Sequence, residues 1–580
     1  MQSVSSPVAV KDGILFISDE SGLPQLWKYD SSEKTYAPFL ETEDRIQFLK
    51  KFPNSDDLII GMDIQGNERE QLYLVSENKE ITRLTKVDDA IHVFGGISND
   101  GHHVAWASNE RDARFYDIYT MNMNTKQLTR VLETDGTFRV LGWRPSGDEL
   151  VIQEVYTNLY NRIGFLNIHT KDIRWLLDTD ENSSFHSPKF SSDGQVIYVL
   201  SNYGRETTGL AQMDLETMKL TWLDDPDWDI ENLTINPDKS KLAYTTNEGG
   251  IDKGWILNIH SGHRVSFELG FGTLADLAWN VANEIHLIYN APTQPADVYV
   301  HYIDTGVSER LYCTLATSEF EAQLIEPEVY TVRSFDGRSI PSFLYKPKEY
   351  NKNTPVAFWV HGGPEGQTKA TYHPVIQSLT SLGYVVCAPN VRGSKGYGKT
   401  YIHLDDVRKR MDSVKDLIEI AEALKEEPYV DEKKVAVIGR SYGGFMVLAA
   451  VTHYPHVFTA GIDLVGISSF RTFLENTGPW RRKLRESEYG TIEADGEFFD
   501  EIDPIHYSER ITAPLMVSHG ANDPRVPIAE TEQIIEELRA RNHPVEYIRF
   551  EDEGHGIVKI ENQITAYTAM ADFLQRLYNE

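Results

Sequence analysis

The chain has 580 residues, more than one hydrophobic core ordinarily serves, so at least two domains are expected. Hydrophobic residues make up 41% and charged residues 25%, a balance typical of soluble globular proteins and not of membrane-spanning or disordered ones. The formal net charge of −32 at pH 7 argues against nucleic acid as a partner, because the phosphate backbone would be repelled.

The compartment is indicated by the N-terminus and the cysteines. Residues 1–7 lack both the basic and the apolar segment of a signal peptide. No uninterrupted apolar run approaches the roughly 18 residues that a membrane-spanning helix needs. Cys313 and Cys387 both lie in apolar sequence surroundings, where packed, reduced thiols are expected. We therefore expect a cytoplasmic protein that does not bind a membrane.

A repeat runs through the first half of the chain. Short β-rich runs begin at positions 15, 58, 104, 150, 197, 242 and 285, and a polar turn and a second strand follow them. Such a period, with several strands in each unit, is typical of β-propeller blades. We predict a β-propeller of seven blades over residues 1–322. The alternative is a pair of β-sandwiches with coincidental spacing.

The second half alternates strands with amphipathic helices. After a hairpin over 328–345, this alternation predicts a largely parallel sheet covered by helices on both faces. Ligands bind such sheets at the carboxyl ends of the strands. We predict an α/β-hydrolase domain over residues 323–580. The expected strands are 356–360, 384–388, 435–438, 460–465, 515–518 and 545–548, and the expected helices are roughly 405–426, 443–453, 529–542 and 561–578.

A candidate nucleophile lies between a predicted strand and a predicted helix. Residues 439–443 read Gly-Arg-Ser-Tyr-Gly and match G-x-S-x-G, the nucleophile elbow of α/β-hydrolases. Glycines two residues before and two after Ser441 let neighbouring chain pass closely. The pattern makes Ser441 the candidate nucleophile, and an ordinary glycine-rich strand-to-helix turn is the alternative.

Two later loops, each after a predicted strand, supply partners for this serine. Asp523 and His555 complete the chain order Ser, Asp, His that is found in α/β-hydrolases. His555 would take the proton of Ser441 near neutral pH, and Asp523 would orient the imidazole. Asn522 is a rival for the acid and His519 for the base, although His519 precedes the acid in the chain.

Acyl transfer also needs hydrogen-bond donors for the developing oxyanion. The backbone N–H of Tyr442, next after the nucleophile, is the first candidate. The second is expected in a loop after an early strand, where residues 361–364 read His-Gly-Gly-Pro. We therefore assign Gly363 and Tyr442 to an oxyanion hole, with a flexible Gly-Gly-Pro turn as the alternative for the loop.

With these residues assembled, the whole chain resembles the prolyl oligopeptidase family of serine peptidases, in which a propeller precedes a hydrolase domain. The motifs that carry the resemblance are residues 389–398, 439–444 and 522–527. The His-Gly-Gly-Pro loop is most similar to that of the acylaminoacyl peptidases. The resemblance implies that the propeller admits only short peptides and that Arg525 contacts a substrate carbonyl or the acyl end. A structural ion pair is the alternative role for Arg525.

The resemblance also implies a specificity pocket, and the chain departs from the family pattern at its N-terminus. We expect the S1 pocket in the segment after Gly466, with Phe470, Phe473 and Trp480 as candidates that are equally plausible as core residues. Members of the family often begin with a helix that packs on the hydrolase domain. Here strand-like sequence starts within about ten residues of the N-terminus.

The expected function follows from the same resemblance. Dipeptidyl aminopeptidases of the family hold the free substrate amine with paired glutamates of the propeller. No convincing Glu–Glu pair occurs in residues 1–322, although a single glutamate such as Glu154 could serve. We therefore expect a serine peptidase that releases an N-acylated amino acid from short blocked peptides. The alternatives are a dipeptidyl aminopeptidase, an oligopeptidase, a carboxylesterase, and a scaffold with an inactive hydrolase domain. Neither a metal nor a cofactor is expected, and a homo-oligomer is compatible with the sequence.

Overall fold

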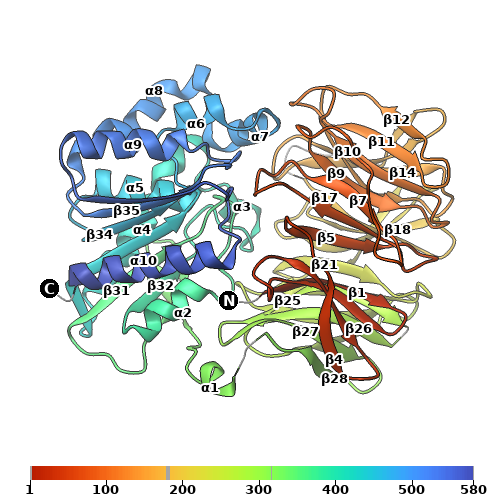
Figure 1. The fold of residues 1–580 in the computed structure, drawn as a ribbon, viewed down its shortest axis with the longest axis horizontal. Helices are drawn as coiled ribbons and strands as arrows, with labels where there is room; N and C mark the ends of the chain where they lie inside the picture. The colour runs from red at the N-terminus through yellow and green to blue at the C-terminus, as the bar shows by residue number, and fades with distance from the viewer. Residues whose placement is uncertain (1–2, 178–182, 282, 315–316, 579–580) are drawn as a thin grey trace.

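The computed structural model describes residues 3–177, 183–281, 283–314 and 317–578. Two bodies of different architecture lie side by side (Figure 1): a ring of β-sheets from the first half of the chain and a helix-covered sheet from the second. The predicted fold class, a seven-bladed β-propeller followed by an α/β-hydrolase domain, is confirmed. None of the helices in these residues is both long enough and apolar enough to span a membrane.

Each blade of the propeller is an antiparallel sheet of four strands that are consecutive in the chain. Blades 1 to 4 consist of β1 (Val4–Val10), β2 (Gly13–Ser18), β3 (Gln25–Asp30) and β4 (Thr35–Leu40); β5 (Ile46–Lys51), β6 (Leu58–Met62), β7 (Gln71–Val75) and β8 (Ile81–Arg83); β9 (His92–Ile97), β10 (His103–Ser108), β11 (Asp117–Asn122) and β12 (Leu128–Leu132); β13 (Thr137–Trp143), β14 (Glu149–Val155), β15 (Asn161–Asn167) and β16 (Ile173–Trp175). Blades 5 to 7 consist of β17 (Phe185–Phe190), β18 (Val196–Ser201), β19 (Gly209–Asp214) and β20 (Lys219–Asp224); β21 (Asp229–Ile235), β22 (Lys241–Asn247), β23 (Asp252–Asn258) and β24 (Arg264–Phe267); β25 (Thr273–Val281), β26 (Glu284–Ala291), β27 (Gln294–Tyr302) and β28 (Val307–Tyr312).

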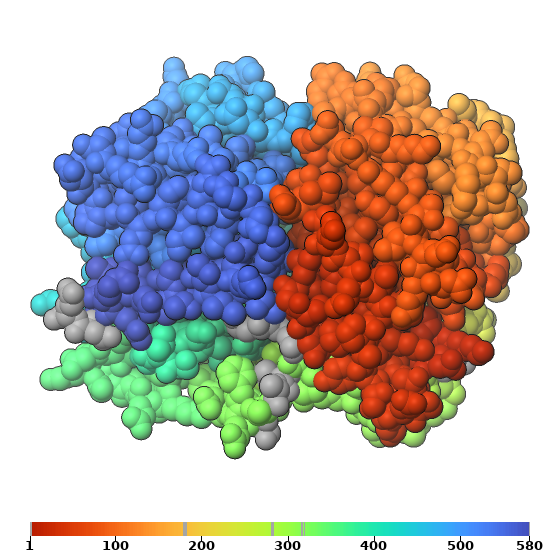
Figure 2. All heavy atoms as spheres, in the orientation of Figure 1, coloured from red at the N-terminus to blue at the C-terminus, as the bar shows by residue number. Residues whose placement is uncertain are grey.

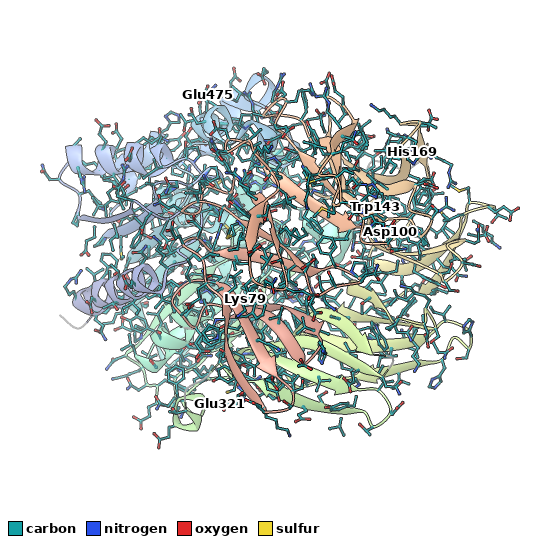
Figure 3. All side chains as sticks on the ribbon, turned by 45° about the vertical axis from the view of Figure 1, so that its right-hand side comes forward. Lys79, Asp100, Trp143, His169, Glu321 and Glu475 are labelled. Carbon is teal, nitrogen blue, oxygen red and sulfur yellow. The ribbon has the colours of Figure 1, made fainter. Side chains whose placement is uncertain are left out.

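The seven repeating runs found in the sequence coincide with the second strand of each blade. These strands lie inside their sheets and are mostly buried, as β2 and β18 illustrate. Burial on both faces explains why their apolar runs were the visible signal. The outermost strands, such as β4 and β8, are largely exposed, so their sequences carry no such pattern. Adjacent blades are also joined by hydrogen bonds. Nε1 of Trp143, the residue labelled in Figure 3, donates to the Gly96 carbonyl oxygen of the preceding blade at 3.2 Å.

The ring closes by side-chain packing between the first and the last blade. Each of the seven blades described uses only its own four consecutive strands, so blades 1 and 7 share none. Phe16 of blade 1 packs with Val298 and Tyr312 of blade 7 in one buried cluster. The Ser6 N–H of blade 1 donates to Asp276 Oδ2 of blade 7 at 2.7 Å. Burial of these apolar side chains therefore stabilises the contact between blades 1 and 7 that closes the ring.

The hydrolase sheet has the strand order β29-β30-β32-β31-β33-β34-β35-β36. β30 pairs antiparallel with β29 and β32, and all other neighbours are parallel. Its strands are β29 (Glu328–Arg333), β30 (Ser339–Tyr345), β31 (Thr354–Val360), β32 (Val385–Pro389), β33 (Val430–Arg440), β34 (Ala460–Leu464), β35 (Leu515–Gly520) and β36 (Val545–Phe550). All of the predicted strands of this domain are present.

Helices cover both faces of this sheet, as predicted. α4, α5 and α9 contribute to the core on one face, and α2 and α10 to the core on the other. The sequence analysis missed α1, α2, α3 and the insertion α6–α8. Of these, α1, α3 and α6 are short helices, which carry few periodic positions. The described helices are α1 (Ser318–Glu321), α2 (Pro374–Ser381), α3 (Gly398–Ile402), α4 (Arg410–Lys425), α5 (Tyr442–His453), α6 (Phe470–Asn476), α7 (Pro479–Tyr489), α8 (Ile492–Ile502), α9 (Ala529–Ala540) and α10 (Ile560–Tyr578), with 3₁₀ turns η1 (Val407–Lys409) and η2 (Pro504–Arg510).

The segment between the two domains joins the last propeller strand to the first strand of the hydrolase sheet. β28 ends at Tyr312 and β29 begins at Glu328, so the predicted boundary at 322/323 lies in the connection.

Cys387 is buried in β32, where burial raises the pKa of its thiol to about 12. The expectation that Cys313 is packed was wrong, because this residue follows the last propeller strand and is exposed.

The ring joint gives a stability prediction. Replacing Phe16, which is fully buried, with alanine should lower the free energy of unfolding by about 3–5 kcal/mol, because a cavity opens in the cluster. Urea unfolding followed by tryptophan fluorescence measures the loss. Val307→Ala, at a site on β28 that is 56% exposed, is the control and should change the value by less than about 0.5 kcal/mol. Equal effects of the two substitutions would contradict the proposed joint.

Candidate active site

The predicted elbow is a tight turn between β33 and α5. Ser441 has φ 60° and ψ −121°, a conformation that non-glycine residues rarely adopt. Its N–H donates to the Leu464 carbonyl oxygen at 2.8 Å. A Cβ atom on Gly439 would lie 2.1 Å from the Gly443 carbonyl oxygen, and one on Gly443 would lie 2.2 Å from the Val360 carbonyl oxygen. The expected close approach around the serine is therefore confirmed, and any larger residue at either glycine would displace backbone.

The loops after β35 and β36 bring Asp523 and His555 together. His555 Nδ1 lies 2.6 Å from Asp523 Oδ2, and both side chains are buried. Asp523 Oδ1 accepts the N–H groups of Arg525 at 2.8 Å and Val526 at 3.1 Å, which fixes the carboxylate plane. Because the carboxylate accepts from Nδ1, the proton of a neutral imidazole lies there, and Nε2 can accept another proton.

The histidine loop is tied to the elbow through its backbone. Arg440 Nη2 donates to the His555 carbonyl oxygen at 2.7 Å, and Arg440 directly precedes Ser441. Among the described residues, no hydrogen bond links the Ser441 hydroxyl to His555. In unliganded enzymes the bond between nucleophile and base is often long and tightens when substrate binds.

Burial and neighbouring charges set the protonation of this pair. Burial lowers the pKa of His555, and the charge of Asp523 opposes that effect. Burial alone would raise the pKa of Asp523, but His555 and His519 hold it well below its usual value. The pair therefore combines a neutral imidazole with an ionised carboxylate at neutral pH, which is the state that general-base catalysis requires.

The two rivals from the sequence analysis have other contacts. His519 Nε2 donates to the Val526 carbonyl oxygen at 2.9 Å and lies 3.4 Å from Asp523 Oδ2, while Nδ1 is 2.8 Å from the Thr531 hydroxyl. Both ring nitrogens are thus engaged, and His519 braces the acid loop. Asn522 Nδ2 donates to the carbonyl oxygens of Gln65 at 3.3 Å and Glu551 at 3.2 Å. Asn522 therefore binds backbone, and among the described residues it has no hydrogen bond to either histidine.

The His-Gly-Gly-Pro loop lies directly against the serine. A Cβ atom on Gly362 would be 3.1 Å from Ser441 Cβ. Gly363 has φ 136°, and its carbonyl oxygen accepts from Arg485 Nη1 at 3.2 Å and from the Tyr489 hydroxyl at 3.4 Å. Tyr442 is the first residue of α5, so its N–H belongs to the helix end that lacks intrahelical acceptors. Tyr442 and Gly362, the residue before Gly363, therefore lie next to the serine, and the assignment of Gly363 and Tyr442 as oxyanion donors stays a prediction.

The assigned substrate-binding residues differ in their surroundings. Arg525 lines a cavity of about 400 Å³ together with His555, and its Nε lies 2.6 Å from Glu68 Oε1 of blade 2. Phe470 and Phe473 are buried in the hydrolase core, and Trp480 packs against blade 3. Neither this cavity nor the larger one below is lined by any of these three aromatic residues. Their role in an S1 pocket stays a prediction.

A second, larger cavity of about 840 Å³ lies between the domains. Strands of blades 4 to 6 line one side, and Lys395, Glu365 and Arg485 of the hydrolase domain line the other. In the space-filling view of Figure 2 the two halves of the molecule meet along a seam. The sequence analysis missed Glu68 in a propeller loop and Arg485 on α7. The four-residue spacing of Arg481 and Arg485 was the available signal for a shared helix face.

Comparisons with known proteins agree with this geometry. Residues 370–580 match the prolyl oligopeptidase family. Dipeptidyl aminopeptidase BIII of Pseudoxanthomonas mexicana is 26% identical over 559 residues, which cover 89% of this chain and 78% of that protein. A puromycin-hydrolysing peptidase of Mycobacterium tuberculosis has a similar fold, with a TM-score of 0.89 and 19% identity over 99% of this chain and 94% of that one. The Pyrococcus horikoshii acylaminoacyl peptidase gives a TM-score of 0.75 and 18% identity over 99% and 96%. These matches show that the hydrolase domain is similar to the prolyl oligopeptidase family, and they support a serine-type peptidase.

Proposed function

We propose that the chain is an aminopeptidase that releases dipeptides from the unblocked N-termini of short peptides. Ser441 acts as the nucleophile, His555 as the general base, and Asp523 orients the imidazole. The observation that carries the proposal is the carboxylate of Glu68, which the propeller supplies to the same cavity as His555. A carboxylate in that position suits the ammonium group of a free N-terminus.

Glu68 keeps acceptor capacity for an amine. Both of its oxygens lie within 2.8 Å of Arg525 Nε, but a carboxylate has about four acceptor sites. Glu70, two residues further on, is a second carboxyl group of the same loop, and burial with the nearby Asp63 raises its pKa to about 8. An arriving ammonium group would favour the ionised form of Glu70. The sequence alone did not identify this pair, in which Arg69 separates the two glutamates.

Glu154, the glutamate considered from the sequence, is engaged elsewhere. It accepts from the Tyr156 hydroxyl at 2.6 Å and from Arg162 Nε at 2.7 Å within blade 4. The similarity to a dipeptidyl aminopeptidase over 89% of the chain also supports a free substrate amine. Short substrates are supported by the position of both cavities between propeller and hydrolase domain, because a folded protein could not enter them.

The proposed reaction follows from the geometry. The Ser441 hydroxyl oxygen attacks the scissile carbonyl while His555 Nε2 takes its proton. The backbone N–H of Tyr442 and the 361–364 loop stabilise the oxyanion. His555 then gives the proton to the leaving amine, and the C–N bond breaks to leave an acyl-enzyme. Water repeats the attack with the same base and frees the dipeptide.

The second candidate is release of an N-acylated amino acid. The His-Gly-Gly-Pro loop favours it, because the sequence resembles the acylaminoacyl peptidases at that loop. An acyl group has no charge for Glu68 to bind, so the substrate amine distinguishes the two candidates.

A substrate panel tests the proposal. We expect turnover of Ala-Ala-p-nitroanilide to exceed that of N-acetyl-Ala-p-nitroanilide, and Ser441→Ala to abolish both. Glu68→Gln should raise KM for the unblocked substrate by about 10- to 100-fold, because a charge-assisted hydrogen bond is lost, and leave the acetylated one unchanged. Glu154→Gln is the matched control. Preference for the acetylated substrate, or a KM effect of Glu154→Gln alone, would contradict the assignment.

The acid limb of the pH profile tests the triad. In the wild type, kcat/KM should rise with pH through a value below the usual histidine pKa of about 6.5, because burial favours the neutral imidazole. Asp523→Asn removes the charge that stabilises the imidazolium, so the limb should move to still lower pH while kcat falls by about 10⁴. A limb that stays in place or moves to higher pH would exclude Asp523 as the partner.

A further inference from the structure

Helix α7 bridges the two loops that form the active site. At its start, the Gly478 N–H donates to the Pro524 carbonyl oxygen at 3.2 Å, and the Thr477 hydroxyl donates to the Arg525 carbonyl oxygen at 2.8 Å. At its end, Arg485 and Tyr489 donate to the carbonyl oxygen of Gly363. The helix therefore runs from the acid loop to the oxyanion loop.

Arg481 lies on this helix between the two anchors and one turn before Arg485, so the two side chains share a face. Arg485 is paired: its guanidinium lies 3.5 Å from Glu365 and 3.2 Å from Glu488, in addition to its bond to Gly363. The Nη1 atom of Arg481 is buried and has no hydrogen-bond partner among the residues that the structure describes. A buried charged donor without an acceptor is rare in native structures and calls for an explanation.

The propeller fixes the start of the helix from the other side. Trp480 packs against Ile91, Ala107 and Tyr116 of blade 3, so its neighbour Arg481 is held at the junction of the two domains. Burial and the positive charges of Arg485 and Arg525 lower the pKa of Arg481 to about 10. The negative charges of Glu68 and Asp523 partly offset this by raising it. The side chain is therefore still a cation at neutral pH. Its charged neighbours are Arg485 on the same helix, Asp523 and Arg525 of the acid loop, and Glu68 of the proposed amine site.

We propose that Arg481 binds a carboxylate of the substrate. The guanidinium offers a planar set of donors that suits a carboxylate, and its buried Nη1 has no acceptor within the described part of the chain. Two sources of that carboxylate fit a short peptide: an acidic side chain in the dipeptide to be released, or the free C-terminus of a tripeptide. This inference rests on the proposed function for the orientation of the peptide, whose amine lies at Glu68.

Substrates with and without a carboxylate test the inference, because the effect of the substitution on KM is measured for each substrate separately. Asp-Ala-p-nitroanilide carries a side-chain carboxylate, Ala-Ala-Ala a C-terminal one, and Ala-Ala-p-nitroanilide neither. Arg481→Met should raise KM by about 10- to 100-fold for one of the first two substrates, without changing KM for the third. The affected substrate identifies the source. Ala-Ala-Ala-amide, which lacks the terminal charge, serves as the check on the C-terminal arm.

Two controls separate this role from a structural one. Arg482→Met removes the neighbouring arginine, which pairs with Glu486 on the same helix, and should leave all KM values unchanged. The rate at which a fluorophosphonate labels Ser441 should be the same in Arg481→Met and wild type, because the probe has no carboxylate. An equal KM increase for all substrates, slower labelling, or no KM change would each overturn the proposal.

The outcome is independent of the amine assignment. If the wild type prefers acetylated substrates, the proposed function fails, but N-acetyl-Asp-p-nitroanilide and N-acetyl-Ala-p-nitroanilide still compare a substrate with and without a carboxylate. A selective effect of Arg481→Met on the first would then support the arginine site alone, and equal effects on both would reject it.

Discussion

The strained turn at Ser441 is the constraint on which the site depends. The serine can occupy its positive-φ conformation because β33 and α5 hold both ends of the turn. It also depends on Gly439 and Gly443, since a Cβ atom on either glycine would lie only 2.1 or 2.2 Å from a backbone oxygen. Gly443 also packs against Val360, the last residue of β31. Because the 361–364 loop follows β31 directly, this contact brings the loop against the serine. A single local geometry therefore positions the nucleophile and the oxyanion loop together.

The propeller contributes to the site as well as covering it. The backbone of Gly66 in blade 2 lies so close to Gly554 that a Cβ atom on Gly66 would be 2.6 Å from the Gly554 nitrogen, next to His555. On the other side, Asn158 of blade 4 donates to Glu365, which follows the oxyanion loop. The two loops that carry the candidate base and oxyanion donors therefore each have a contact in the propeller. Relative movement of the domains would act on both loops.

The sequence predicted those parts of the molecule that have a strong local pattern. The buried second strands of the blades and the parallel strands around Ser441 are continuous apolar runs, and the order of Ser441, Asp523 and His555 followed from loops after such strands. The outer blade strands and α6–α8 lack that pattern. Glu68 and Arg525 are 457 positions apart in the chain, and only folding shows that they pair. Long-range ion pairs of this kind leave no trace in a single sequence.

The electrostatics of the site contrast with those of the whole chain. Acidic residues exceed basic ones by 88 to 56, yet Arg440, Arg481, Arg485 and Arg525 gather around the serine and its loops. Three of them are fixed by hydrogen bonds to His555, Gly363 and Glu68, so their charges cannot turn away towards solvent. Fixed cations in a partly enclosed space attract carboxylates more strongly than the same charges on an open surface. Glu68 is the acidic residue that lines the same cavity as His555, next to Arg440 and Arg525. The proposed zwitterionic peptide would therefore meet opposite charges at its two ends, which an uncharged ester would not use.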